Sequence, residues 1–200
     1  IPLSHTQDVG GPLARSLEDL AVALDATIGA DPSDPATAVL EGRDLPSFVA
    51  ALNPNALDGA RIGILEAYFG NGGVEAAAAS IVRQAIAKMV ELGADTITIE
   101  IPNLQDLISG SGVISHEFKW DLIDYLAGVP NAPVNSLEEM LELGLIHEAL
   151  TPGMRRRNAP ESRETDAYAA ALAKREPLKN AVVSVMEAAQ VDALIYPTMR

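Results

Sequence analysis

The sequence predicts an α/β protein, because short apolar strands alternate along it with longer stretches of helical periodicity. The clearest unit lies between residues 61 and 101, where a short apolar strand, an alanine-rich helix and a β-branched strand follow one another. A further apolar strand at residues 192–196 follows a long helical stretch. Strands joined by crossover helices pair in parallel and place helices against the sheet. We therefore expect a mixed β-sheet that is covered by helices on both faces.

The composition is that of a folded, acidic protein. The 200 residues are 48% hydrophobic, with 28 acidic against 14 basic residues and a net charge of −14. Nucleic acids and anionic membranes bind concentrated positive charge, so neither is an expected partner. No run approaches the ~18 apolar residues of a membrane span, and no cysteine is present for a disulfide. The length predicts that residues 1–200 form a single domain or a large piece of one.

The first helix is predicted by the capping box Ser16-x-x-Asp19 and by the leucines at helical spacing that follow it. Gly29 is expected to end this helix. Residues 30–58 contain four prolines among polar residues. We therefore expect a long surface connection there, with at most a short helix at residues 48–52.

The strand–helix–strand unit has predicted bounds of 61–65, 74–92 and 96–101. Its helix is expected to bury one apolar stripe, formed by Ile81, Val82, Ala85, Ile86 and Met89. The glycine-rich loop before the helix fails the dinucleotide-binding spacing and lacks the Gly-Lys-Ser/Thr of a phosphate loop, so we interpret it as a turn.

The second half of the chain is predicted to be mainly helical. Residues 104–127 show helical periodicity that breaks around residues 109–112, and Ser136 caps a helix that Gly144 stops. Residues 151–164, with three consecutive arginines, are predicted to form a polar loop. Residues 166–190 are predicted to form one long helix that bends or restarts at Pro177.

No complete catalytic motif is found in the chain. Ser109-Gly110-Ser111-Gly112 fails Gly-x-Ser-x-Gly, and no serine has a lysine three positions later. The three histidines, His5, His116 and His147, lack metal-ligand spacing. We therefore expect no metal site, no cofactor and no Ser-His-Asp triad.

The polar segment from Ser4 to Ser16, with its Gly10-Gly11-Pro12 turn, resembles a segment of the amidase signature family, whose members are serine hydrolases of amides. Later stretches resemble the family in the expected order, and the second of them resembles its peptide-amidase-like branch. They are Leu57-Asp58-Gly59-Ala60-Arg61-Ile62-Gly63-Ile64, then Glu117-Phe118-Lys119-x-Asp121-Leu122-x-x-Tyr125-Leu126, then Val191-Asp192-Ala193-Leu194-Ile195-Tyr196-Pro197-Thr198.

The resemblance implies the C-terminal part of an amidase-signature fold, an incomplete part of a larger domain. In this family the Ser-cisSer-Lys catalytic region lies upstream of the matched segment, so no catalytic residue is expected in this chain. The whole gene product would cleave carboxylic amides to an acid and ammonia or an amine. This chain would supply scaffold and part of the substrate pocket, and would be inactive alone.

The matched segments also imply the site residues. Asp8 and Arg15 are expected to form a buried ion pair that supports the site. Seven residues are expected to contact the substrate, namely Thr6, Gln7, Asp8, Glu117, Phe118, Tyr196 and Thr198.

Two other functions stay open, a glutaminase-type subunit of an amidotransferase complex and a non-catalytic α/β binding module. The expected partners are a small-molecule or peptide amide and the N-terminal portion of the same protein, and a homodimer stays open. The compartment is unknown, with a cytoplasmic location favoured.

Overall fold

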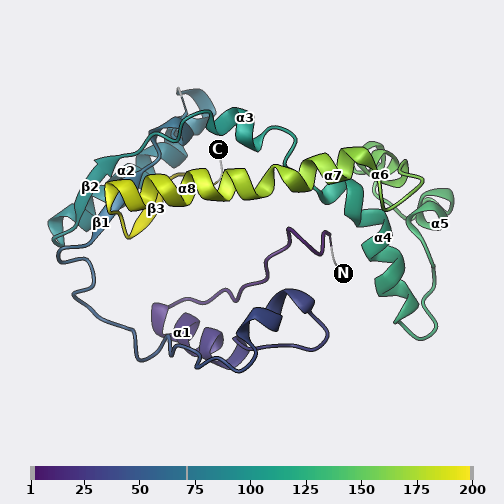
Figure 1. Cartoon of the computed structure of the whole chain (residues 1–200), viewed down its shortest axis with the longest axis horizontal. Helices are drawn as coiled ribbons and strands as arrows, with labels where there is room; N and C mark the ends of the chain where they lie inside the picture. Colours follow the sequence, from purple (N-terminus) through teal and green to yellow (C-terminus); the bar gives the residue numbers. More distant parts are fainter. Residues whose placement is uncertain (1–2, 71, 199–200) are drawn as a thin grey trace. The chain divides into compact units, whose positions relative to one another are not determined.

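The computed structural model describes residues 3–70 and 72–198 and confirms the α/β class (Figure 1). The described chain divides into two compact units. Unit 1 contains the residues up to Gly10 together with Gln105–Leu178, and unit 2 contains Gly11–Leu104 with the residues from Lys179 onward. The grouping of both units into one domain stays a prediction.

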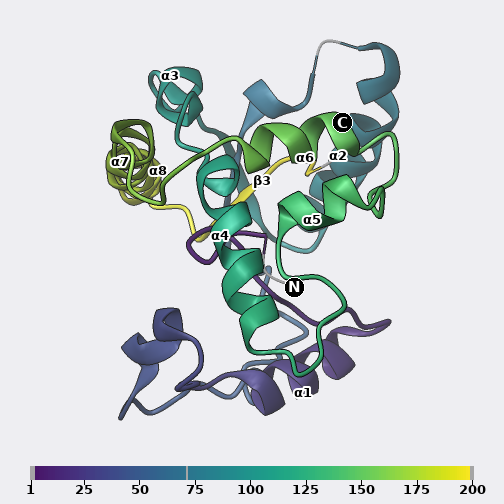
Figure 2. The same ribbon diagram turned by 90° about the vertical axis from the view of Figure 1, so that its right-hand side faces the viewer.

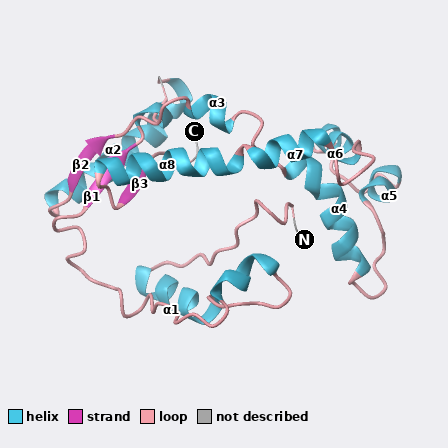
Figure 3. Ribbon diagram, in the orientation of Figure 1, coloured by secondary structure: helices cyan, strands magenta, loops and turns pink. Residues whose placement is uncertain are grey.

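Unit 2 contains a three-stranded sheet with the order β2-β1-β3, drawn in magenta in Figure 3. The strands are β1 (Arg61–Ile64), β2 (Asp95–Thr98) and β3 (Ala193–Ile195). β1 pairs in parallel with both neighbours. The parallel strand–helix–strand unit is thus confirmed. The described residues include no antiparallel strand, so the sheet seen there is parallel rather than mixed.

One face of the sheet packs against α8 (Arg175–Ala189). The buried residues of this core are Leu65, Ile99, Ile101 and Val191, and the residues of α8 that pack on them are Ala181, Val182, Val185, Met186 and Ala189.

The crossover helix α2 (Ala76–Glu91) follows a short 3₁₀ turn, η3 (Gly73–Glu75). The prediction of a broad buried stripe on α2 is wrong within unit 2, because only Ile86 of the five predicted residues is buried. Ile81 is 68% exposed. Helical spacing fixes which side chains share a face, but the neighbours of that face decide their burial.

The start of unit 2 contains α1 (Leu17–Thr27), whose N-cap is the predicted Ser16. The Asp19 backbone N–H donates to Ser16 Oγ over 3.0 Å. The connection after α1 contains the 3₁₀ helix η1 (Pro35–Leu40), which was not predicted, and residues 48–51 form turns. A second 3₁₀ turn, η2 (Glu66–Tyr68), follows β1.

The remaining α-helices belong to unit 1, except that Leu104, the first residue of the first of them, is assigned to unit 2. They are α3 (Leu104–Ile108), α4 (Ile114–Ala127), α5 (Leu137–Glu142), α6 (Thr151–Asn158) and α7 (Asp166–Ala173). α4, α5 and α6 contact one another, as Figure 2 shows, and their core contains Phe118, Leu122 and Leu137.

Two predictions for unit 1 are wrong. The segment expected to be a polar loop contains α6, with its three arginines in the last turn, where positive charge complements the helix dipole. The long helix breaks at Lys174 rather than at Pro177. Pro177 lies in the first turn of α8, where a missing N–H costs no helical hydrogen bond.

No helix within the described ranges is both long and apolar enough to cross a membrane.

Candidate functional site

The first described residues form a tight turn that lies against α4 within unit 1. The backbone N–H groups of Leu3 and Ser4 donate to Asp8 Oδ2 over 2.6 Å and 3.0 Å. The Asp8 N–H returns a hydrogen bond to the Ser4 carbonyl. Asp8 therefore closes the turn within unit 1. Arg15 belongs to unit 2, and the buried ion pair expected between Asp8 and Arg15 stays a prediction.

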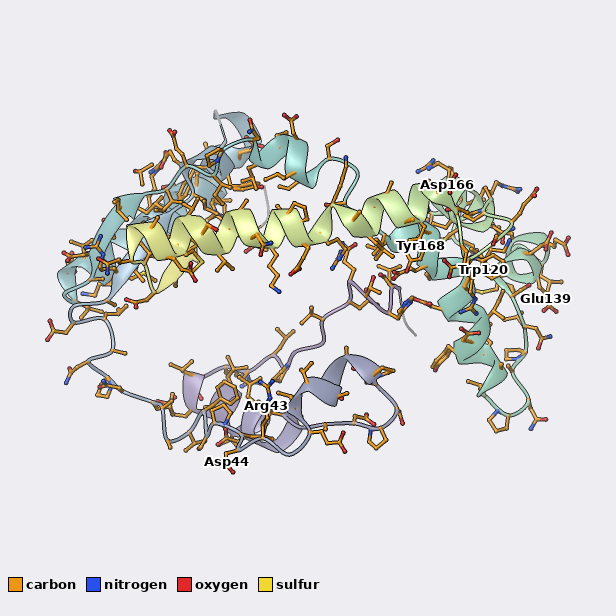
Figure 4. The ribbon with its side chains drawn as sticks, in the orientation of Figure 1. Arg43, Asp44, Trp120, Glu139, Asp166 and Tyr168 are labelled. Carbon is orange, nitrogen blue, oxygen red and sulfur yellow. The ribbon has the colours of Figure 1, made fainter. Side chains whose placement is uncertain are left out.

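Glu117 on α4 holds this turn through its carboxylate. From the described residues it accepts four hydrogen bonds, from Ser4 Oγ, from Thr6 N (3.2 Å), from Thr6 Oγ1 (2.5 Å) and from the Tyr168 hydroxyl (2.7 Å). Ser4 is fully buried and Glu117 is only 2% exposed. Figure 4 shows Tyr168 on α7 beside α4, the helix that also carries Trp120. Every oxygen of this buried carboxylate is therefore paired.

The hydrogen bonds set the charge state of the Glu117–Tyr168 pair. Burial alone would raise the pKa of Glu117, but the hydrogen bonds from Ser4, Thr6 and Tyr168 outweigh it and lower that pKa below its ordinary value. Burial and the hydrogen bond to Glu117 raise the pKa of Tyr168 to about 12. At neutral pH the pair is thus a carboxylate that accepts from a neutral phenol.

Asp121 lies one helical turn after Glu117 on the same face of α4. It is 7% exposed and accepts from the His5 backbone N–H (2.7 Å) and from His5 Nδ1 (2.9 Å). Two buried carboxylates of one helix therefore hold three consecutive residues, Ser4, His5 and Thr6. We call these residues and the two carboxylates the carboxylate clasp.

Two further hydrogen bonds fix the same segment. Arg175 donates to the Thr6 carbonyl over 3.1 Å. The Gln7 side chain accepts from the Val113 N–H at the start of α4 over 3.1 Å, which satisfies one of the free N–H groups of the helix N-terminus. The side-chain oxygen of Gln7 is therefore already engaged in a hydrogen bond with the protein's own backbone.

A metal ion does not fit the clasp. Ligand atoms of His5, Glu117 and Asp121 lie within 4.8 Å of one another, which is close enough for a shared cation. A carboxylate offers about four lone-pair positions, and the hydrogen bonds described above already use those of Glu117. Hydrogen bonds, rather than a metal ion, stabilise the negative charge of the Glu117 carboxylate.

A cavity of about 150 Å³ opens beside the clasp. The rings of His116, Trp120 and Tyr168 line it together with His5 and Asp121. The His116 and Tyr168 rings stack with centroids 5.7 Å apart. The walls of this cavity thus combine aromatic rings with carboxylate oxygens that accept hydrogen bonds.

The other predicted substrate contacts are Phe118 in unit 1 and Tyr196 and Thr198 in unit 2. Phe118 points into the core of unit 1, with the Arg157 guanidinium 5.5 Å from its ring centroid. Tyr196 and Thr198 follow β3 in unit 2. The ring centroids of Tyr196 and Tyr68 are 5.3 Å apart. Within unit 1 the structure brings Thr6 and Glu117 together, whereas their role in substrate binding stays a prediction.

Sequence reasoning missed the roles of His5, Asp121 and Tyr168. The four-residue spacing of Glu117 and Asp121 is a signal that two acids share one helix face. His5 lies 116 positions from Asp121, so no local pattern predicts their contact. Tyr168 had no distinguishing signal in the sequence.

Comparisons with known proteins agree on the family. The amidase family profile matches residues 1–200. A glutamyl-tRNA(Gln) amidotransferase subunit of Pseudomonas fluorescens is 37% identical over 115 residues, which are 58% of this chain and 23% of that protein. The same subunit of Moorella thermoacetica is 32% identical over 140 residues, covering 67% of this chain and 28% of that protein.

Solved structures are similar over the whole chain. The native peptide amidase of Stenotrophomonas maltophilia has a TM-score of 0.83 at 30% identity, covering 100% of this chain and 42% of that one. An amidase family protein of Bacillus anthracis shares the fold, with a TM-score of 0.75 at 22% identity over 100% of this chain and 40% of that one. The chain thus spans less than half the length of these proteins. It belongs to the amidase family.

Proposed function

We propose that this chain is part of an amidase that hydrolyses carboxylic amides, and that it supplies scaffold and part of the substrate pocket. The observation that carries the proposal is the similarity to a peptide amidase along the entire chain, with a TM-score of 0.83. The resemblance assigns the nucleophilic serine and its lysine to a region outside these residues. The substrate would be a small-molecule or peptide amide.

The pocket residues proposed from the sequence fall into two sets. Thr6, Gln7, Asp8, Glu117 and Phe118 belong to unit 1. Tyr196 and Thr198 follow a parallel strand in unit 2, and ligands of open α/β sheets bind beyond the carboxyl ends of such strands. Tyr196 and Thr198 are exposed and can contact a ligand. By contrast, both carboxylate oxygens of Glu117 already accept hydrogen bonds from the protein, and Phe118 packs in the core of unit 1. We therefore give the contact role chiefly to Tyr196 and Thr198.

The test is an ammonia-release assay of the full-length gene product with C-terminally amidated dipeptides and simple aliphatic amides. We expect hydrolysis, and we expect Thr198→Val to raise KM more than Thr37→Val, an exposed threonine of η1. Absence of ammonia and amine release from every amide would overturn the proposal.

A second function is favoured by a separate observation. The glutamyl-tRNA(Gln) amidotransferase subunit recurs among the curated relatives at 36–38% identity over 115 residues. A glutaminase-type subunit would release ammonia from glutamine and would depend on partner subunits. Release from glutamine but not from peptide amides in the same assay would select this alternative.

A further inference from the structure

His5 presents a fixed imidazole at the edge of the cavity beside α4. Its Nδ1 lies 2.9 Å and 3.0 Å from the two oxygens of Asp121 and 3.5 Å from an oxygen of Glu117. Ionised carboxylates only accept hydrogen bonds, so Nδ1 carries the ring proton. In the neutral ring the lone pair is therefore on Nε2.

The surroundings fix one side of this ring and leave the other open. Asp121 is 7% exposed and also accepts the His5 backbone N–H, so it holds ring and main chain together. The His5 side chain is 58% exposed, and the described residues provide no hydrogen bond to Nε2. The basic nitrogen is thus accessible, while the protonated nitrogen faces the acid.

His147 provides the opposite arrangement in the same unit. Its Nδ1 accepts a hydrogen bond from the Ala149 N–H over 3.2 Å, so in the neutral ring the proton is on Nε2. His147 is also exposed. His147 therefore serves as an internal reference for His5, because it is an exposed histidine whose Nε2 carries the proton of the neutral ring and so has no free lone pair.

We propose that His5 and Asp121 form a nucleophilic imidazole site that reacts through Nε2 with electrophilic acyl compounds. Nε2 adds to the carbonyl carbon and forms an N–C bond, and the leaving group departs with the electron pair of its C–O bond. The positive charge of the acylated ring is stabilised through Nδ1–H by the Asp121 carboxylate. Water then adds to the carbonyl carbon, and the C–N bond breaks with its electron pair returning to Nε2. The proton that water loses goes to the departed leaving group, so the products are the acid, the protonated leaving group and the neutral ring.

This site does not depend on the proposed amidase function. It needs only His5, Asp121, the acyl compound and water, and it uses no serine or lysine. A protein without amide hydrolysis could still show it, and an active amidase could lack it.

The probe is diethyl pyrocarbonate, applied to the purified protein at about pH 8, above the ordinary imidazole pKa of about 6.5. Peptide mass spectrometry then gives the carbethoxylation rate of each histidine. We expect His5 to react about tenfold faster than His147, because Asp121 both exposes the lone pair and stabilises the charged product. Asp121→Asn is expected to lower the His5 rate to that of His147.

The matched control is Asp124→Asn, an exposed acid of α4 that pairs with Arg163 rather than with His5. It is expected to leave the His5 rate unchanged. Equal or slower reaction of His5 compared with His147, or an unchanged His5 rate in Asp121→Asn, would overturn the proposal.

A measurement on the unsubstituted protein keeps the test valid if Asp121→Asn unfolds. Long-range ¹H–¹⁵N NMR spectra distinguish protonated from unprotonated imidazole nitrogens. We expect a protonated Nδ1 and an unprotonated Nε2 for His5, and the reverse for His147. A protonated Nε2 in neutral His5 would contradict the assignment.

Discussion

At the scale of single residues, the fold of unit 1 depends on a few buried polar groups that satisfy one another. Ser4 and Glu117 are both almost inaccessible to solvent, and buried donors and acceptors must pair to avoid a desolvation penalty. The Glu117 carboxylate meets this requirement for Ser4, Thr6 and Tyr168 together. Its contribution to stability therefore exceeds that of an exposed acid.

Glu117→Gln is expected to lower the free energy of unfolding by about 3 kcal/mol, because it weakens charged hydrogen bonds and turns an amide NH₂ toward buried donors. Urea denaturation measures this change. The control is Glu138→Gln, an exposed acid in the first turn of α5, for which we expect a change within about 0.5 kcal/mol. Equal effects of the two substitutions would contradict the role given to Glu117.

The lowered pKa of Glu117 predicts a loss of stability in acid. As the pH falls below 4.5, the ordinary pKa of a glutamate side chain, the Glu117 carboxylate binds a proton in the unfolded chain before it does so in the folded chain. The contribution of Glu117 is therefore complete above pH 4.5 and is lost as the pH falls through the lower, folded-state pKa. The free energy of unfolding, measured against pH, is expected to decline less steeply below pH 4.5 in Glu117→Gln. Identical acid slopes in both proteins would rule this linkage out.

The residues of the clasp show how far the sequence could predict a site. Glu117 and Asp121 occur in a recognisable helical stretch, so their shared face follows from their spacing. Their partner His5 lies more than a hundred positions away, and only the folded chain brings the imidazole to the acid. The substrate contact expected for Glu117 from the sequence stays a prediction, and the structure adds that its carboxylate accepts hydrogen bonds from Ser4, Thr6 and Tyr168.

At the scale of elements, the sequence predicted the helices, strands and caps that depend on residues close together in the chain. The parallel β1–α2–β2 unit and the Ser16 and Ser136 caps were predicted, because periodicity and capping act within a few residues. The break between α7 and α8 was assigned to Pro177, although a proline in a first helical turn is tolerated. The sparse burial of α2 depends on distant neighbours and could not be read from its spacing.

Gly63 in β1 tests the packing of the sheet. A Cβ at this position would lie 2.7 Å from side-chain atoms of both Ile99 and Leu194. Gly63→Ala is thus expected to lower the free energy of unfolding by about 1–3 kcal/mol through overpacking. Gly29→Ala, where a Cβ meets nothing within 4 Å, is expected to change it by less than about 0.5 kcal/mol. Thermal unfolding of both variants checks this, and a neutral Gly63→Ala would show that the sheet packs more loosely.

At the scale of the whole molecule, this chain is a part of the amidase fold that matches 42% of the peptide amidase structure. Many large apolar side chains are exposed in it, among them Leu13 at 101% and Ile81 at 68%. Large exposed apolar areas mark surfaces that associate with other protein. We infer that the remainder of an amidase fold covers part of this surface.

The 200 residues are accordingly expected to self-associate in solution. Static light scattering measures the mass in solution. A monodisperse, cooperatively unfolding monomer would contradict the expectation, because such behaviour shows that the exposed apolar residues need no cover.

Hydrogen exchange tests most directly whether α4 holds residues 4–6 through two buried carboxylates. The backbone N–H of His5 donates to Asp121 and that of Thr6 donates to Glu117, whereas Val9 is 93% exposed. We predict that the His5 and Thr6 amides exchange much more slowly than the Val9 amide, and that Glu117→Gln speeds the exchange of Thr6. Exchange of His5 and Thr6 as fast as that of Val9 would show that the clasp does not form.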